Sequence, residues 1–212
     1  MISTKITKPG KIMVVDPSGS HLAYTICEIN PITNKLVILD VGMIWTTDKW
    51  SLGQRFTYVF NCLELLARES DIDHIFTEAY FSSPNFRSGT HIIPTINHIM
   101  QMIAYQSDKD ITYEEISPSA WRKPLAIKAD IKEGKKDFKT PTKRKVEEVL
   151  GKLPEEIVSN ITGNNRSLPT DVPDALAISI YIGMEFKLNV DMSTILSYTK
   201  YSLKFKELIG VK

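Results

Sequence analysis

Hydrophobic and polar positions alternate with a period of two at the start of the chain, which is typical of β-strands. In KIMVVDPSGS, the side chains of Ile12, Val14 and Asp16 fall on one face, and the sequence PSGS then ends the strand. Two further apolar runs, over 22–29 and 35–45, are joined by NPITN, a sequence typical of a hairpin turn. These segments predict three antiparallel strands in a meander.

After the meander, strand and helix patterns alternate along the chain. In 51–69, apolar residues recur at spacings of three and four, which predicts an amphipathic helix. Further strands are expected over 74–81 and 110–118, and further helices over 94–105, over 142–151 and from residue 170 or 171 to about 183. A loop is expected over 154–169, which is rich in Pro, Gly and Asn. This order predicts an α/β fold, a five-stranded mixed sheet with helices on both faces.

The length of 212 residues suits one domain with a small appendage. We expect residues 1–185 to form the α/β domain and 186–212 to form a C-terminal helical extension. The composition, 42% apolar and 24% charged, is that of a soluble globular protein, and no apolar run approaches a membrane span. Cys27 and Cys62 form no CxxC pair, so we expect reduced core thiols and a cytoplasmic protein, in the host cytoplasm if the chain is viral.

Positive charge is concentrated in one segment. Residues 120–145 hold ten basic and three acidic residues, a net charge of +7, which leaves −6 for the rest of a chain whose total is +1. A block of this kind is typical of a surface that binds a polyanion, but it is also found in solvated loops that bind nothing. Charge alone leaves both interpretations open.

Four acidic residues begin or end predicted core elements. Asp16 closes the first strand, Glu78 lies near the end of the fourth, and Asp171 and Asp174 open the last helix, three residues apart and therefore on one face. If the first and fourth strands pair, all four carboxylates can face one cleft, where they must be screened by cations. Hard divalent cations prefer oxygen ligands, and two ions about 3.5–4 Å apart can clamp both oxygens of an in-line phosphodiester displacement.

Each acid also has a simpler explanation. Asp171 and Asp174 could cap a helix and complement its dipole, and Asp16 could be a turn residue. Glu78 is harder to explain in this way, because it lies late in an apolar strand on the same face as Phe76. The ordered set of four therefore favours a metal site over four unrelated structural roles.

These residues lie in segments that resemble the RuvC family of Holliday-junction resolvases, within the ribonuclease H-like (retroviral integrase) superfamily. IMVVDPSG resembles the family's strand ending in Asp-Pro-Gly, and FTEAYF resembles its strand ending in Glu with Phe three residues later. DVPDALAIS resembles its Asp-x-x-Asp-Ala-x-Ala-x-Ala segment, and PSAWR and KRKV resemble its basic middle region. The resemblance runs from about residue 11 to residue 183.

The resemblance implies a ribonuclease H-like fold and a homodimeric crossover junction endodeoxyribonuclease with two Mg²⁺ or Mn²⁺ ions in each active site. Such an enzyme nicks opposing strands of a four-way DNA junction symmetrically, in recombination, repair or DNA debranching, without a nucleotide cofactor or a membrane partner. The implied catalytic residues are Asp16, Glu78, Asp171 and Asp174 as metal ligands, with Lys143 beside the attacking water or scissile phosphate. The implied DNA-binding residues are Phe81, which would stack on a base, and Arg122, Lys123, Lys143, Arg144 and Lys145.

The chain also departs from the family pattern. Ser18 stands where glycine is usual, and the stretch between Arg122 and Lys143 is longer than the family's short Gly-rich link. These departures indicate a diverged branch, such as a phage-encoded or organelle member. They leave two alternatives open: a broader nuclease of the same fold acting on flaps, forks or RNA, and a non-catalytic nucleic-acid-binding protein. The helix IIPTINHIMQMIAY, apolar nearly all round, could lie in the core or at a dimer interface.

Overall fold

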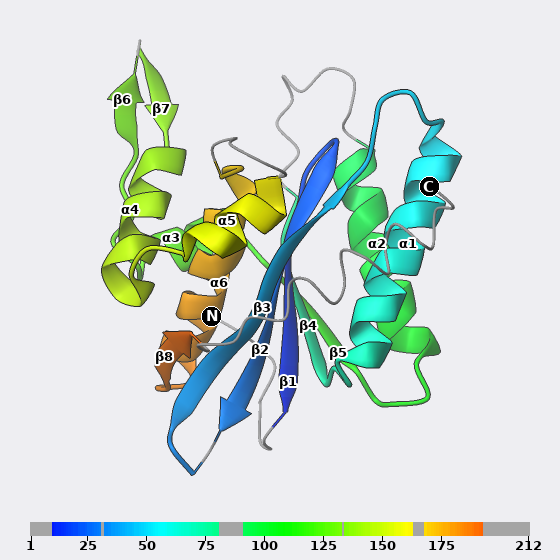
Figure 1. Ribbon diagram of the computed structural model, residues 1–212, viewed down its shortest axis with the longest axis horizontal. Helices are drawn as coiled ribbons and strands as arrows, with labels where there is room; N and C mark the ends of the chain where they lie inside the picture. The colour runs from blue at the N-terminus through cyan, green and yellow to red at the C-terminus, as the bar shows by residue number, and fades with distance from the viewer. Residues whose placement is uncertain (1–9, 31, 81–90, 133, 163–167, 193–212) are drawn as a thin grey trace.

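A central mixed sheet, covered by helices on both faces, forms the body of the molecule (Figure 1). The structure is a computed structural model and describes residues 10–30, 32–80, 91–132, 134–162 and 168–192. The sheet has six strands in the order β5-β4-β1-β2-β3-β8. Their bounds are β1 (Lys11–Pro17), β2 (His21–Asn30), β3 (Lys35–Trp45), β4 (His74–Glu78), β5 (Thr112–Ile116) and β8 (Asn189–Met192).

The strand directions agree with the predicted order of elements. Strands β1, β2 and β3 form the expected antiparallel meander, and β4 and β5 continue the sheet in parallel beside β1. The sheet has one strand more than expected, because β8 pairs in parallel with the outer side of β3. The α/β class, the mixed sheet and the helices on both faces are confirmed.

The side chains of alternate strand residues point to opposite faces of the sheet and belong to two separate hydrophobic cores. Met13 and Val15 of β1 pack under α1 (Leu52–Glu69) and α2 (Ile92–Gln106), whereas Val14 packs under α6 (Asp171–Glu185). Helix α6 is apolar nearly all round and is buried from its first residue to Gly183, because it lies between the sheet and α4. The remaining elements are α3 (Pro118–Arg122), α4 (Lys139–Leu150), α5 (Glu155–Thr162) and a small separate hairpin of β6 (Asp130–Lys132) and β7 (Lys135–Asp137).

Three segments differ from the sequence-based expectations. Helix α5 lies within the stretch expected to be a loop, since Ile157 and Ile161 can be buried in the core. The β6–β7 hairpin lies within the basic segment, where no strands were expected. Helix α6 ends at Glu185, but residues 189–192, expected in a helical extension, form β8. Pairing with β3 gives this strand backbone hydrogen-bond partners and packs Val190 against the core. The rest of the extension, 193–212, lies outside the described residues.

Helix α2 is less buried than its sequence suggests. One side packs into the core, but Met102 and Tyr105 on the other side are 48% and 90% exposed. Within the described residues, every helix is too short or too polar to span a bilayer.

Candidate metal centre

Two of the four predicted acids are brought together by the pairing of β1 with β4. Val14 lies opposite Phe76 in this parallel pair, and both side chains belong to the core under α6. Asp16 and Glu78 lie two residues further along their strands, so they point to the same face and are neighbours there. The predicted adjacency of the first and fourth strands is confirmed.

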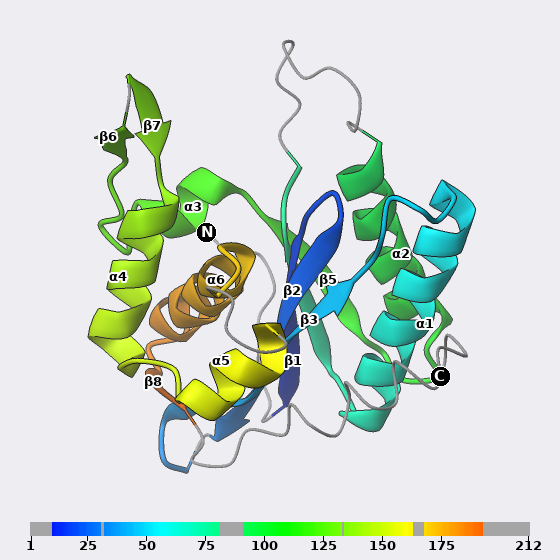
Figure 2. The same ribbon diagram turned by 45° about the horizontal axis from the view of Figure 1, so that its top comes forward.

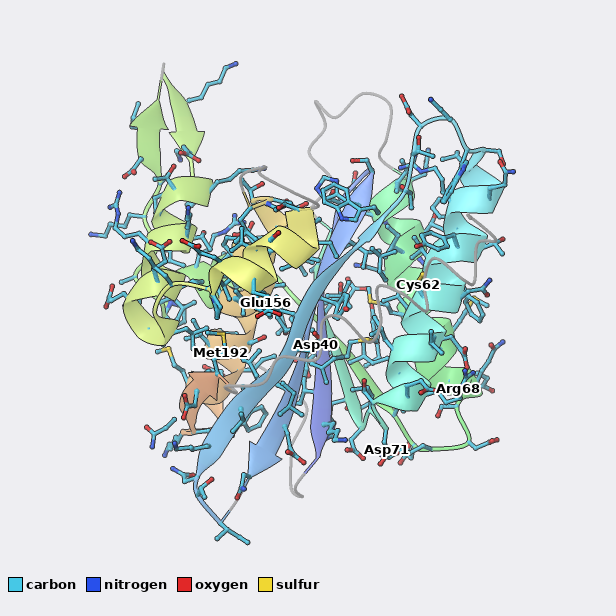
Figure 3. All side chains as sticks on the ribbon, in the orientation of Figure 1. Asp40, Cys62, Arg68, Asp71, Glu156 and Met192 are labelled. Carbon is cyan, nitrogen blue, oxygen red and sulfur yellow. The ribbon has the colours of Figure 1, made fainter. Side chains whose placement is uncertain are left out.

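The other two acids come from the first turn of α6. Asp171 and Asp174 are both buried at the start of this helix, which packs across β1, β2 and β3. Pro173 is tolerated in the same turn because the backbone amides there have no partner within the helix. Figure 2 shows the start of α6 at the same end of the sheet as the turn between β1 and β2. Figure 3 shows side chains filling the space between the sheet and the layer of α4 and α6.

The electrostatics show that these carboxylates share one site. Burial raises the pKa of Asp16 well above its usual range, and the negative charges of Glu78, Asp174 and Asp171 raise it further. Burial and the charge of Glu78 raise the pKa of Asp174 to about 7. Burial also raises the pKa of Glu78, against the opposing effect of Arg122. A site in which anions oppose one another's ionisation favours a bound cation.

Glu78 is held by two residues of α3. The Trp121 indole Nε1 donates a hydrogen bond of 3.0 Å to Glu78 Oε1, and Arg122 Nη2 lies 3.5 Å from the same oxygen. The Arg122 guanidinium lies over the rings of Trp121 and Phe138, at 4.6 and 4.8 Å from their centroids. Arg122 was predicted at this site, whereas the contact of Trp121 was not, because a buried tryptophan is more often only a core residue.

Asp171 has a partner that sequence reasoning missed. His21, the first residue of β2, places Nε2 at 2.7 Å from Asp171 Oδ2. Burial would raise the pKa of Asp171, but the contact with His21, aided by the nearby charge of Lys139, outweighs burial and lowers this pKa. No spacing of His21 with other metal-ligating residues marks it in the sequence. Only its position just after the Asp16 turn could have suggested it.

Helix α4 contributes polar groups from its first two turns. Lys139 Nζ donates to Thr170 Oγ1 at 2.6 Å, next to Asp171, and Thr142, near Asp174, donates its hydroxyl to the Phe138 carbonyl at 2.8 Å. Lys143 is exposed on the next position of this helix and lies 3.9 Å from Glu147. Its predicted role at the scissile phosphate stays a prediction. Lys139, one turn earlier in α4, is the lysine whose contact with Thr170 lies beside Asp171.

The other predicted DNA-binding residues that the structure describes make no ion pair with the four carboxylates. Arg144 lies 3.7 Å from Asp130, and Lys145 Nζ lies 2.8 Å from Glu148. Lys123 is exposed just after α3. Phe81 lies outside the described residues. The DNA-binding roles of these residues stay predictions.

The chemistry of the four carboxylates fits a hard divalent cation, but their side chains do not converge on one point. Among the residues that the structure describes, no group of three or more His, Cys, Asp or Glu side chains has the arrangement of a metal site. Glu78 is turned to Trp121 and Arg122, and Asp171 to His21. Asp174 Oδ1 is buried without a hydrogen-bond partner in the described part of the chain, which leaves it free to coordinate a cation.

Comparison with known sequences shows one clear relationship. No family model matches the chain. The chain is 29% identical over 172 residues to the crossover junction endodeoxyribonuclease RuvC of Prochlorococcus marinus subsp. pastoris. The alignment covers 80% of this chain and 94% of that protein.

Comparison with solved structures shows the same fold. Thermus thermophilus RuvC in complex with a Holliday junction substrate matches with a TM-score of 0.57 and 13% identity, covering 81% of this chain and 91% of that one. The yeast mitochondrial Holliday junction resolvase Ydc2 matches with a TM-score of 0.55 and 14% identity, covering 93% of this chain and 83% of that one. The chain is therefore RuvC-like in sequence over most of its length and has the ribonuclease H-like fold that its sequence predicts.

Proposed function

We propose that this protein is a metal-dependent endonuclease that resolves four-way DNA junctions by paired, symmetric nicks. The observation that carries the proposal is the placement of Asp16, Glu78, Asp171 and Asp174, from two strands and a helix, close enough at one end of the sheet for their charges to act on one another. The similarity to RuvC over 80% of the chain supports the same activity.

In this proposal the four carboxylates hold two Mg²⁺ or Mn²⁺ ions. The ions would supply the activated water and the stabilisation of the leaving oxygen in phosphodiester hydrolysis. Glu78 Oε2 and Asp171 Oδ1 would face the ions, while Glu78 Oε1 keeps its contacts with Trp121 and Arg122 and Asp171 Oδ2 keeps its contact with His21. Arg122 lies beside Glu78 and would place its guanidinium next to a DNA phosphate bound at the ions.

The protein would act as a homodimer, because a four-way junction offers two equivalent strands to two equivalent sites. The exposed side of α2, with Met102 and Tyr105, supplies an apolar surface for a two-fold contact. Two free, buried cysteines, Cys27 and Cys62, fit our further proposal that the protein works in a reducing cytoplasm.

The test is cleavage of a synthetic four-way junction beside matched linear duplex, fork, flap and RNA substrates, with Mg²⁺, Mn²⁺ or EDTA. We expect symmetric paired nicks on the junction only, abolished by EDTA and by Asp174→Asn. The Asp174→Asn variant should still bind the junction, since the substitution removes a negative charge and no phosphate contact. Equal cutting of forks, flaps or RNA would favour the broader nuclease. A protein that binds the junction but cuts nothing would contradict the enzymatic proposal.

A further inference from the structure

The β6–β7 hairpin projects from the body of the molecule as a separate arm. Figures 1 and 2 show it extending beyond α4, toward the end of the molecule where α6 begins. Each strand has only three residues, and the hairpin is not part of the main sheet. A two-stranded hairpin of this size is marginal by itself in water. The hairpin therefore needs an explanation other than a contribution to the hydrophobic core.

Two acidic side chains of the arm, Asp130 and Asp137, are directed back to α4. Asp137 accepts hydrogen bonds from the Lys139 backbone amide at 2.9 Å and from Thr140 Oγ1 at 2.8 Å. Asp130 lies 3.7 Å from Arg144. These contacts anchor the base of the arm and leave both carboxylates occupied at the α4 side.

Two basic residues of the arm have no ion-pair partner among the described residues. Lys135 and Lys136 are exposed, and neither has an ion pair with any side chain that the structure describes. Ile131, the partner of Lys136, is 69% exposed. A polyanion bound to this surface would neutralise Lys135 and Lys136, and a DNA phosphate backbone is the polyanion that the proposed function supplies.

A short stretch of chain joins the arm to a residue that contacts the region of the carboxylate site. Lys136 comes three residues before Lys139, whose ammonium group contacts Thr170 beside Asp171. At about 3.3 Å for each extended residue, Lys136 lies within about 10 Å of Lys139 along the backbone. Successive phosphates of one B-DNA strand advance about 3.4 Å along the axis. Lys136 is therefore close enough to reach phosphates within about three nucleotides of a strand position held at the carboxylates.

We propose that the β6–β7 hairpin is a DNA-binding arm, in which Lys135 and Lys136 bind backbone phosphates of a duplex arm about three nucleotides from the cut. This inference rests on the proposed function and adds an interaction that the carboxylate site does not contain. The arm holds the duplex through charge, so it contributes affinity and position but no base selectivity.

The test is the double variant Lys135→Ala/Lys136→Ala, with Lys152→Ala/Lys187→Ala as a control that removes two exposed lysines elsewhere. Binding of a labelled junction is measured by fluorescence anisotropy in EDTA over a range of salt concentrations. Removing one lysine–phosphate interaction reduces the slope of log K against log salt by about 0.9, so the arm variant should lower it by about 2 and the control should not. A slope equal to that of the wild type would overturn the inference.

A second measurement locates the phosphates that the arm binds. A neutral methylphosphonate is placed at single positions along the strand, and the affinities of wild-type and arm-variant protein are compared. We expect the two proteins to become equal when the neutral group lies about three nucleotides from the cut, and an unchanged difference at every position would refute the assignment. If the wild type cuts junctions and the arm variant binds them exactly as well, the inference fails and the function stands. If the wild type neither binds nor cuts a junction, both fail.

Discussion

The imidazole of His21 holds one carboxylate of the candidate metal centre, with Nε2 at 2.7 Å from Asp171 Oδ2. The ring is itself held in place, because it packs against Trp45 with centroids 5.0 Å apart and its Nδ1 lies 2.8 Å from Ser20 Oγ. The contact joins the start of β2 to the start of α6. It keeps Asp171 oriented in a site where the other acids are disfavoured as anions.

Removing the His21 imidazole should weaken metal binding. We expect His21→Leu to lower the affinity for Mn²⁺ by about 10–100-fold, the usual cost of removing a group that orients a metal ligand. Titration calorimetry without DNA measures the affinity, and junction cleavage at several Mn²⁺ concentrations measures its consequence. His21→Gln keeps a hydrogen-bond donor and should restore part of the affinity. Wild-type affinity in His21→Leu would show that Asp171 needs no such partner.

His21 also shows where prediction from the sequence ends. The period of two in β1 and β4 placed Asp16 and Glu78 on one face, and the apolar run of α6 placed Asp171 and Asp174 at its start. Each of these patterns lies within one short segment of the chain, so a single sequence is enough to detect it. The contact of His21 with Asp171 depends on how β2 and α6 pack across a separation of 150 residues. No local pattern records this packing.

The same distinction applies to the missed elements. The β6–β7 strands of three residues are too short to show a period, and their lysines obscure it further. Strand β8 has only four residues, and it forms because the edge of β3 offers partners for its backbone. The buried face of α5 is visible in the sequence as Ile157 and Ile161, but the surrounding Pro, Gly and Asn residues favoured a loop.

Asp174 should make the metal-free protein less stable as pH rises. Its pKa is raised to about 7 in the folded protein, from an ordinary value near 3.8, by burial and by Glu78. Between these two values the folded protein binds more protons than the unfolded chain, so the free energy of unfolding falls as pH increases from about 4 to about 7. Asp174→Asn removes this loss. We expect the variant to be more stable than the wild type at pH 8 in EDTA, by an amount on the order of 1–3 kcal/mol.

Thermal unfolding at pH 4.5 and pH 8 checks this prediction. At pH 4.5 wild-type Asp174 is already protonated in the folded protein, so the difference between the two proteins should shrink. Saturating Mg²⁺ at pH 8 should stabilise the wild type more than the variant, which lacks one ligand. A variant that is equally destabilised at both pH values would indicate that Asp174 is a structural residue.

The Trp121 indole N–H should be needed for activity more than for folding. Trp121→Phe keeps an aromatic ring in the buried position but removes the donor to Glu78 Oε1 and part of the surface beneath Arg122. We expect junction cleavage to fall about 10-fold, as is usual when an orienting hydrogen bond to a metal ligand is removed. The smaller ring should cost about 1–2 kcal/mol of stability, which urea unfolding measures.

The matched control is Trp50→Phe. Trp50 packs edge-on against Tyr58 under α1, on the opposite side of the sheet from the carboxylates. The Trp50→Phe variant should lose a similar amount of stability, measured by urea unfolding, without a comparable loss of junction cleavage. If both variants lose cleavage in proportion to stability, Trp121 acts only through packing.

The exposed side of α2 should carry the subunit contact. Tyr105 is 90% exposed and lies three residues after Met102, so both side chains share one face of the helix. Tyr105→Glu places a charge on this face, and in a two-fold contact the substitution introduces two like charges. We expect light scattering after size exclusion to show a dimer of wild type and a monomer of the variant at low micromolar concentration.

Leu52→Glu, at the exposed start of α1, serves as the control and should remain dimeric. Paired nicking of one junction should decline with the dimer, while the thermal unfolding temperature of each subunit stays close to that of the wild type. A monomeric wild type that nicks both strands in one binding event would contradict the role given to this face.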